Sequence, residues 1–172
     1  MMCTYWENAV KDFLQSKSVN IERKIANKSN EILILEGNGM EIKINEQSQK
    51  FHLATTEGYV HGIGHGIQVG KYKFCAIPIG KNINISEVTT GVKVINVPIT
   101  IDIYIQTSTT EDAMKFLIKV GEMVRRIISK AENIDTLIED AKKSIIESFG
   151  EIPQPEDVET DWIFDEESEI VH

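Results

Sequence analysis

Residues 95–130, INVPITIDIYIQTSTTEDAMKFLIKVGEMVRRIISK, decide the fold class of this chain. From Ile95 to Ile105 every odd position is Ile or Val, and the even positions are Asn, Pro, Thr, Asp and Tyr. This period of two predicts a long strand, starting at Val92, with one buried face. We therefore expect Ile101 and Ile103 to be core residues.

The pattern changes to helical spacing after this strand. Ser108-Thr109-Thr110-Glu111 is a capping box and predicts a helix that runs to Lys130. A second amphipathic helix is predicted from Asn133 to Phe149. The expected buried residues are Ala113, Phe116, Leu117, Val120, Val124, Ile127 and Ile128 in the first helix, and Ile134, Leu137, Ile138, Ala141, Ile145 and Ile146 in the second.

The first half of the chain contains one predicted helix and several short strands. Thr4–Ser16 begins with a capping box and has apolar residues on one face. The Gly37-Asn38-Gly39 run predicts a hairpin, because Asn and Gly tolerate positive φ. Glu57–Gly70 holds five of the eleven glycines and is interpreted as a flexible loop or a bulged strand entrance. Strands are predicted at 19–26, 32–35, 40–44, 50–55, 72–79 and 82–86.

These elements predict an α+β fold. It consists of an N-terminal helix, a mainly antiparallel sheet, two C-terminal helices packed on one face, and an acidic tail. Short hairpin connections in the middle of the chain argue against a doubly wound parallel sheet. The expected division is a single domain over 1–150 and an acidic tail or docking arm over 151–172.

The charge is concentrated at the C-terminal end. The net charge is −9, yet residues 1–143 carry 17 acidic and 18 basic residues, a net +1. Residues 144–172 carry 10 acidic residues and no Lys or Arg. Such a tail repels nucleic acid and anionic lipid, and the body has no basic run, so we expect protein partners and neither nucleic acid nor membrane. The chain shows no secretory signal and no membrane span, which predicts a cytoplasmic location.

No set of residues predicts a metal or a cofactor. His61, His65 and Cys75 are zinc-type ligands, but zinc needs three or four of them in tetrahedral geometry and no spacing completes a set. The run Gly66–Lys71 lacks the spacing of a phosphate-binding loop, and Gly58–Gly62 lacks dinucleotide spacing. We therefore expect no metal and no cofactor.

No catalytic residue is predicted either. A Ser-His-Asp or Cys-His arrangement needs residues that meet only in space, so the sequence leaves this alternative open. Cys75 lies in an apolar strand, as an inert core thiol would, and Cys3 and Cys75 are interpreted as free thiols. Asp102 is expected on the polar face of the long strand, solvated or paired across strands.

The tail has apolar residues among its acids. Trp162, Ile163 and Phe164 stand between acidic residues, and Ile170 and Val171 close the chain. One interpretation is a disordered, solubilising tail. The other is a docking arm whose aromatic residues are anchors for a partner surface with Lys or Arg around an apolar groove. On the second interpretation, these five residues are the partner-binding site.

The chain resembles phage tail-terminator and tail-completion proteins of the virion neck. The resemblance covers the first helix and residues 95–130: a strand similar to ITIDIYIQT, then a helix that opens with acids and ends in a basic turn. It implies a non-enzymatic, ring-forming virion subunit that contacts further copies and a neighbouring assembly protein. Residues 39–92, the second helix and the acidic tail depart from the family pattern.

Two other function classes remain open. A small acidic inhibitor or immunity-type protein would mask the basic site of a partner through charge complementarity. An enzyme of unfamiliar type is the third possibility. The size of the protein in solution separates the first two, because an inhibitor forms a small one-to-one complex.

Overall fold

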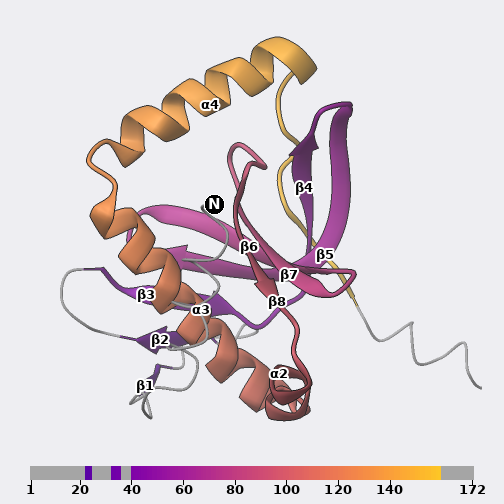
Figure 1. Cartoon of the computed structure of the whole chain (residues 1–172), viewed down its shortest axis with the longest axis vertical. Helices are drawn as coiled ribbons and strands as arrows, with labels where there is room; N and C mark the ends of the chain where they lie inside the picture. The colour runs from indigo at the N-terminus through magenta and orange to yellow at the C-terminus, as the bar shows by residue number, and fades with distance from the viewer. Residues whose placement is uncertain (1–21, 25–31, 36–39, 160–172) are drawn as a thin grey trace, which may run out of the picture.

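The computed structural model describes residues 22–24, 32–35 and 40–159, in which a bent antiparallel sheet is combined with three helices (Figure 1). The predicted helix over Thr4–Ser16 lies outside these residues. None of the described helices is both long and apolar enough to cross a lipid bilayer. The elements are β1 (Glu22–Lys24), β2 (Ile32–Leu35), β3 (Ile42–Asn45), β4 (Gln49–Thr55), β5 (Gly58–Val69), β6 (Tyr72–Ile79), β7 (Asn82–Glu87), β8 (Lys93–Pro98), α2 (Ile101–Gln106), α3 (Thr110–Lys130), α4 (Ile134–Phe149) and β9 (Glu156–Asp157).

The strand order is β1-β2-β3-β5-β6-β7-β8, and every pairing is antiparallel. Strand β4 pairs with the first half of β5, and the short β9 pairs with the other edge of β4. The expected mainly antiparallel sheet is thus confirmed. The hairpin predicted around Gly37–Gly39 is also present as the β2–β3 pair.

Helix α3 covers one face of the sheet and forms the main core with it. Apolar side chains alternate along the strands on that face, for example Ile42 and Ile44 on β3 and Ile67 and Val69 on β5, and all four are buried. The N-cap of this helix lies one residue later than predicted. The Thr109 hydroxyl accepts a hydrogen bond from the Asp112 amide at 3.1 Å, so Thr109, rather than Ser108, is the N-cap.

The predicted long strand is wrong beyond Pro98, where β8 ends and the helix α2 begins three residues later. Thr100 is the N-cap and accepts a hydrogen bond from the Ile103 amide at 3.3 Å. Ile103 is 6% exposed, which confirms it as a core residue, whereas Ile101 is 80% exposed and is not. Asp102 lies in the first turn of α2 instead of on a strand.

The glycine-rich segment is a regular strand, β5, and not a loop. It pairs with β4 along its first half and with β3 and β6 along its second half. A Cβ atom at Gly64 would lie 2.0 Å from the Ala76 carbonyl oxygen, so the glycine allows the backbones of β5 and β6 to approach closely. Glycine here serves close packing within a sheet.

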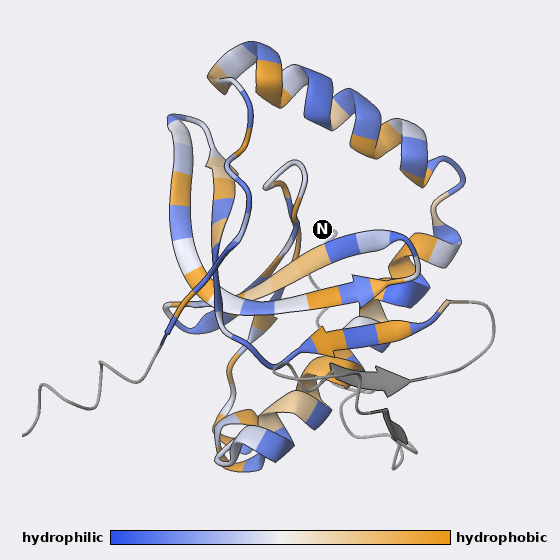
Figure 2. Cartoon of the chain, turned by 180° about the vertical axis from the view of Figure 1, so that it is seen from behind, coloured by the Kyte–Doolittle hydropathy of each residue, from blue (hydrophilic) through white to orange (hydrophobic). Residues whose placement is uncertain are grey.

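Helix α4 does not pack on the sheet as predicted. None of its residues is buried, and Leu137, one of the six expected core residues, is 60% exposed. The helix bridges from the end of α3 to the tip of the β4–β5 hairpin, and no other helix of the described residues covers the sheet face below it (Figures 1 and 2). Of the two helices predicted to pack on one sheet face, only α3 does so.

Candidate functional site

Helix α4 is attached to the body at its two ends. At its start, Asp135 accepts hydrogen bonds from the Lys71 ammonium at 2.8 Å and from the Tyr72 hydroxyl at 2.9 Å. At its end, the Tyr59 hydroxyl donates to the Gly150 carbonyl at 2.7 Å, and the Tyr59 ring contacts the Phe149 ring edge-on. The middle of α4 is thereby held away from the sheet.

Three hollows that share Lys73 have volumes of about 370, 310 and 360 Å³. Strand residues, Val88 and Pro155 line the first, whereas residues of α4 help to line the second and third. Lys73 of β6 lines all three, and Lys142 of α4 lines the second and third. We name the first of them the β5 hollow. Its lining residues are Lys43, Ile44, Asn45, Gln49, Phe51, Gly66, Ile67, Gln68, Lys73, Phe74, Val88 and Pro155.

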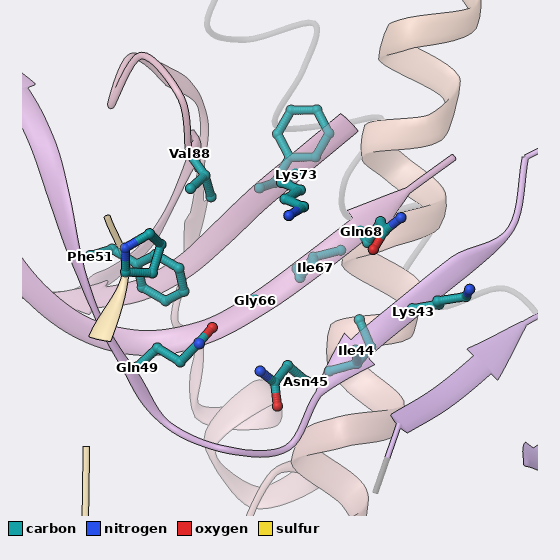
Figure 3. A pocket seen from close by; sticks show the side chains of 12 residues that line it. Lys43, Ile44, Asn45, Gln49, Phe51, Gly66, Ile67, Gln68, Lys73 and Val88 are labelled. Atoms are coloured by element: carbon teal, nitrogen blue, oxygen red, sulfur yellow. The ribbon is translucent and has the colours of Figure 1, made fainter. Parts of the chain in front are cut away.

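The β5 hollow has an apolar end and a basic end. Figure 3 shows Phe51 and Val88 beside a bare stretch of β5 at Gly66, with the Lys73 side chain extending from β6. The cross-strand neighbours Lys43, Gln68 and Lys73 form a polar row over β3, β5 and β6. Among the described residues that line this hollow none is a carboxylate. Lys43 is paired with Glu41 at 2.9 Å, so Lys73 supplies the charge of the basic end. The hollow therefore suits a ligand that combines an apolar group with negative charge.

The α4 end of the same space has mixed charge. Asp135, Glu139 and Glu87 line the third hollow together with Lys71, Lys73 and Lys142. Hydrogen bonds from Lys71 and then Tyr72 hold the pKa of the Asp135 carboxyl below its ordinary value. The Glu87 carboxylate accepts hydrogen bonds from the Thr89 and Thr90 amides. The three acids of this hollow balance its three lysines.

A second exposed surface is the outer face of α2. Ile101, Tyr104 and Ile105 are 80%, 74% and 64% exposed, and their spacing of three and four places them on one face of the helix. Among the described strands, β8, which leads into α2, pairs only with β7 and stands at the end of the sheet. We name these three side chains the α2 patch.

The predicted partner-binding residues Trp162, Ile163, Phe164, Ile170 and Val171 lie outside the described residues. The first part of the predicted arm, however, runs along β4. The Gln49 side-chain amide donates a hydrogen bond to the Asp157 carboxylate at 2.8 Å. The Lys50 ammonium lies 3.6 Å from the Glu156 carboxylate. The boundary at residue 150 and the docking role of the arm stay predictions.

The candidate metal and thiol residues are placed as follows. His61 and His65 lie four residues apart along the extended strand β5, about 13 Å by strand geometry. Within the described ranges no three His, Cys, Asp or Glu side chains are grouped as metal ligands would be. Burial raises the pKa of the Cys75 thiol to about 12, as in an inert core thiol. Cys3 lies outside the described residues.

Sequence reasoning missed both surfaces. Gly66 was the available signal for the hollow, because a glycine in a strand leaves its face without a side chain at that position. The signal for α2 was Thr100 as a possible N-cap, before apolar residues at 101, 104 and 105. The overlapping period of two hid that helical spacing.

Comparisons with protein-family models, with curated proteins and with solved structures each find no match for this chain.

Proposed function

We propose that this chain is a non-enzymatic assembly subunit that associates with further copies of itself through the α2 patch. The observation that carries this proposal is the exposure of Ile101, Tyr104 and Ile105 on α2. The helix is attached to the body by its buried residue, Ile103. Water-exposed clusters of large apolar side chains mark interaction surfaces, because burying them on a partner is favourable.

The edge position of β8 supports the same proposal. An end strand presents unpaired backbone N–H and C=O groups, which a second chain can satisfy. The α2 patch and the β8 edge are consecutive in the chain, so one neighbouring copy can cover both. A contact between two different surfaces of identical copies closes into a ring when its rotation allows.

The more specific proposal is a ring subunit of a virion tail or neck. It rests on the resemblance to tail-terminator and tail-completion proteins. The helical half of that resemblance keeps its predicted form as α3, whereas the strand-like half, ITIDIYIQT, contains α2. The viral role is accordingly supported by α3 alone.

The test is the mass of the full-length protein in solution. We expect multi-angle light scattering and native mass spectrometry to find a homo-oligomer at micromolar concentration. Ile101→Glu with Ile105→Glu should dissociate it without unfolding it, because both side chains are already exposed. The matched control is Leu137→Glu on α4, which places the same charge on another exposed apolar position and should leave the oligomer intact.

Two results would overturn the proposal. A wild-type monomer at tens of micromolar would remove self-association. An oligomer that persists in the double variant would remove the α2 patch as its interface. A tight one-to-one complex of a monomer with a basic protein would instead support the inhibitor alternative.

A further inference from the structure

We propose that the β5 hollow binds the acidic C-terminal segment, residues 160–172, of a second copy of this chain. This inference rests on the proposed self-association and names an additional contact between the copies. The observations that carry it are the shape of the hollow, its charge, and the path of the chain beside it.

The hollow has room for an aromatic side chain. Its floor has no side chain at Gly66, where an added Cβ atom would make ordinary contacts with Gln49 Oε1 at 3.4 Å, Asn45 Cβ at 3.7 Å and the Phe51 ring at 3.9 Å. Phe51, Val88 and Pro155 supply apolar walls. The volume of about 370 Å³ lies within the range of roughly 300–1,000 Å³ that is common for binding pockets.

The charges of the two parts are complementary. Lys43 and Lys73 line the hollow. Lys43 is paired with Glu41 at 2.9 Å, whereas Lys73 has no ion-pair partner among the described residues. The segment TDWIFDEESEIVH has five carboxylates and no Lys or Arg, and its acids surround Trp162 and Phe164. An aromatic anchor in the apolar end would bring neighbouring carboxylates to the lysines, which is the usual division between anchor and charged rim.

The path of the chain favours a second copy over the chain's own segment. Pro155 lines the hollow, and β9 then carries the chain along β4, until the Val158 amide donates to the Ser48 carbonyl at 2.9 Å. The chain is thus leaving the hollow at Val158. Its own segment would have to reverse direction at once to enter, whereas a segment from another copy needs no such turn.

Direct binding is tested with a fluorescein-labelled peptide of residues 160–172. The receptor is the full-length chain with Trp162→Ala and Phe164→Ala, so that its own segments do not compete. We expect saturable binding by fluorescence anisotropy that weakens as salt is added, because the exposed charges are screened. A scrambled peptide of the same composition should bind at least about tenfold more weakly.

Two variants of this receptor examine the hollow. Gly66→Val fills its floor without a change of charge; its Cβ atom makes ordinary contacts, and Val is favoured in strands. Lys73→Glu reverses its charge. Each should weaken peptide binding by about tenfold or more. Lys81→Glu, on the exposed turn between β6 and β7, is the control for charge and should change the affinity by less than about twofold.

Exchange between copies is tested by mixing two full-length chains. One carries Trp162→Ala with Phe164→Ala and keeps the hollow, and the other carries Lys73→Glu and keeps the segment. Both also carry the two α2 substitutions, which silence that interface. Native mass spectrometry should detect mixed pairs, and neither chain alone should pair.

The outcomes separate this inference from the proposed function. The inference is overturned if the receptor with Gly66→Val binds the peptide as tightly as the receptor without it, or if the scrambled peptide binds equally well. The proposed function stands in that case if oligomers that depend on α2 are still found. Peptide binding without mixed pairs would show that the segment of one copy does not reach the hollow of another, and would overturn the role of the second copy. If mixed pairs form and the two α2 substitutions leave the wild-type oligomer unchanged, the inference is supported and only the α2 proposal is overturned.

Discussion

Helices α3 and α4 follow each other in the chain and both have an apolar stripe, yet they end in opposite environments. Ten residues of α3 are buried, and none of α4. The sheet face below α3 is a continuous apolar surface that includes Ile42, Ile67 and Ile85. The opposite face, toward α4, bears Lys43, Gln68 and Lys73 in one row.

This difference shows that an amphipathic helix needs a receiving surface as well as a stripe. Burial of the stripe of α4 on this row would remove charged groups from water, and Lys73 has no ion-pair partner among the described residues, so the burial would be costly. The helix is held at its ends instead, by Asp135 and by Tyr59. Space for a ligand remains beneath it. Four predictions examine this contrast, from the largest expected effect to the smallest.

The largest effect should come from truncation in the α3 core. Ile118 is fully buried, and Ile118→Ala should lower the free energy of unfolding by about 2–5 kcal/mol through lost burial and a cavity. Leu137→Ala on α4 should change it by less than about 0.5 kcal/mol. Urea unfolding followed by circular dichroism measures both. Comparable losses for the two variants would mean that α4 is packed as tightly as α3.

Overpacking gives the second comparison. A Cβ atom at Gly121 of α3 would lie 2.6 Å from Cγ2 of Ile42, so Gly121→Val should cost about 1–3 kcal/mol. Ala141→Val on α4 should cost only the difference in helix propensity, about half a kcal/mol. Thermal melts of the two variants at equal concentration provide the measurement. If Gly121→Val is neutral, α3 does not approach β3 as closely as described.

Acid should affect the body before it affects the attachment of α4. Burial holds the pKa of His65 below its ordinary value of 6.5, so the unfolded chain takes up the proton first. The free energy of unfolding should then fall as the pH drops below 6.5, down to the lowered pKa. His52, whose pKa is lowered chiefly by burial, adds to the same slope. Urea titrations at pH 7, 6 and 5 should show a smaller slope for His65→Gln, and an unchanged slope would rule His65 out.

The Asp135 contact behaves differently because its pKa is held below the ordinary 3.8 by Lys71 and Tyr72. It is complete above that value and is lost only as the pH falls through the lowered pKa. Asp135→Asn should therefore speed amide exchange at the start of α4 at pH 7 and leave the main melting transition nearly unchanged. Glu139→Gln, one turn further on, is the control. A large loss of melting temperature in Asp135→Asn would contradict a local attachment.

Local patterns predicted most of the strands and α3 well. Tyr72–Ile79 was predicted with the bounds that the structure gives β6, since Gly and Pro punctuate that apolar run. The segment after Pro98 could not be predicted in the same way. Ile101, Ile103 and Ile105 satisfy a period of two, while Ile101, Tyr104 and Ile105 equally satisfy helical spacing. Only the exposure of Ile101 and Ile105 in the folded chain separates the two interpretations, since both predict a buried Ile103.

The sequence by itself determined the α+β class, the antiparallel hairpins and the concentration of acid at the C-terminal end, because these depend on neighbours along the chain. The tertiary structure alone decided which apolar stripe is buried and where an open basic surface remains. Burial depends on what the opposing surface offers, and the row of Lys43, Gln68 and Lys73 is assembled from three strands that no local pattern relates. For the same reason the β5 hollow and the α2 patch became visible only in the folded chain.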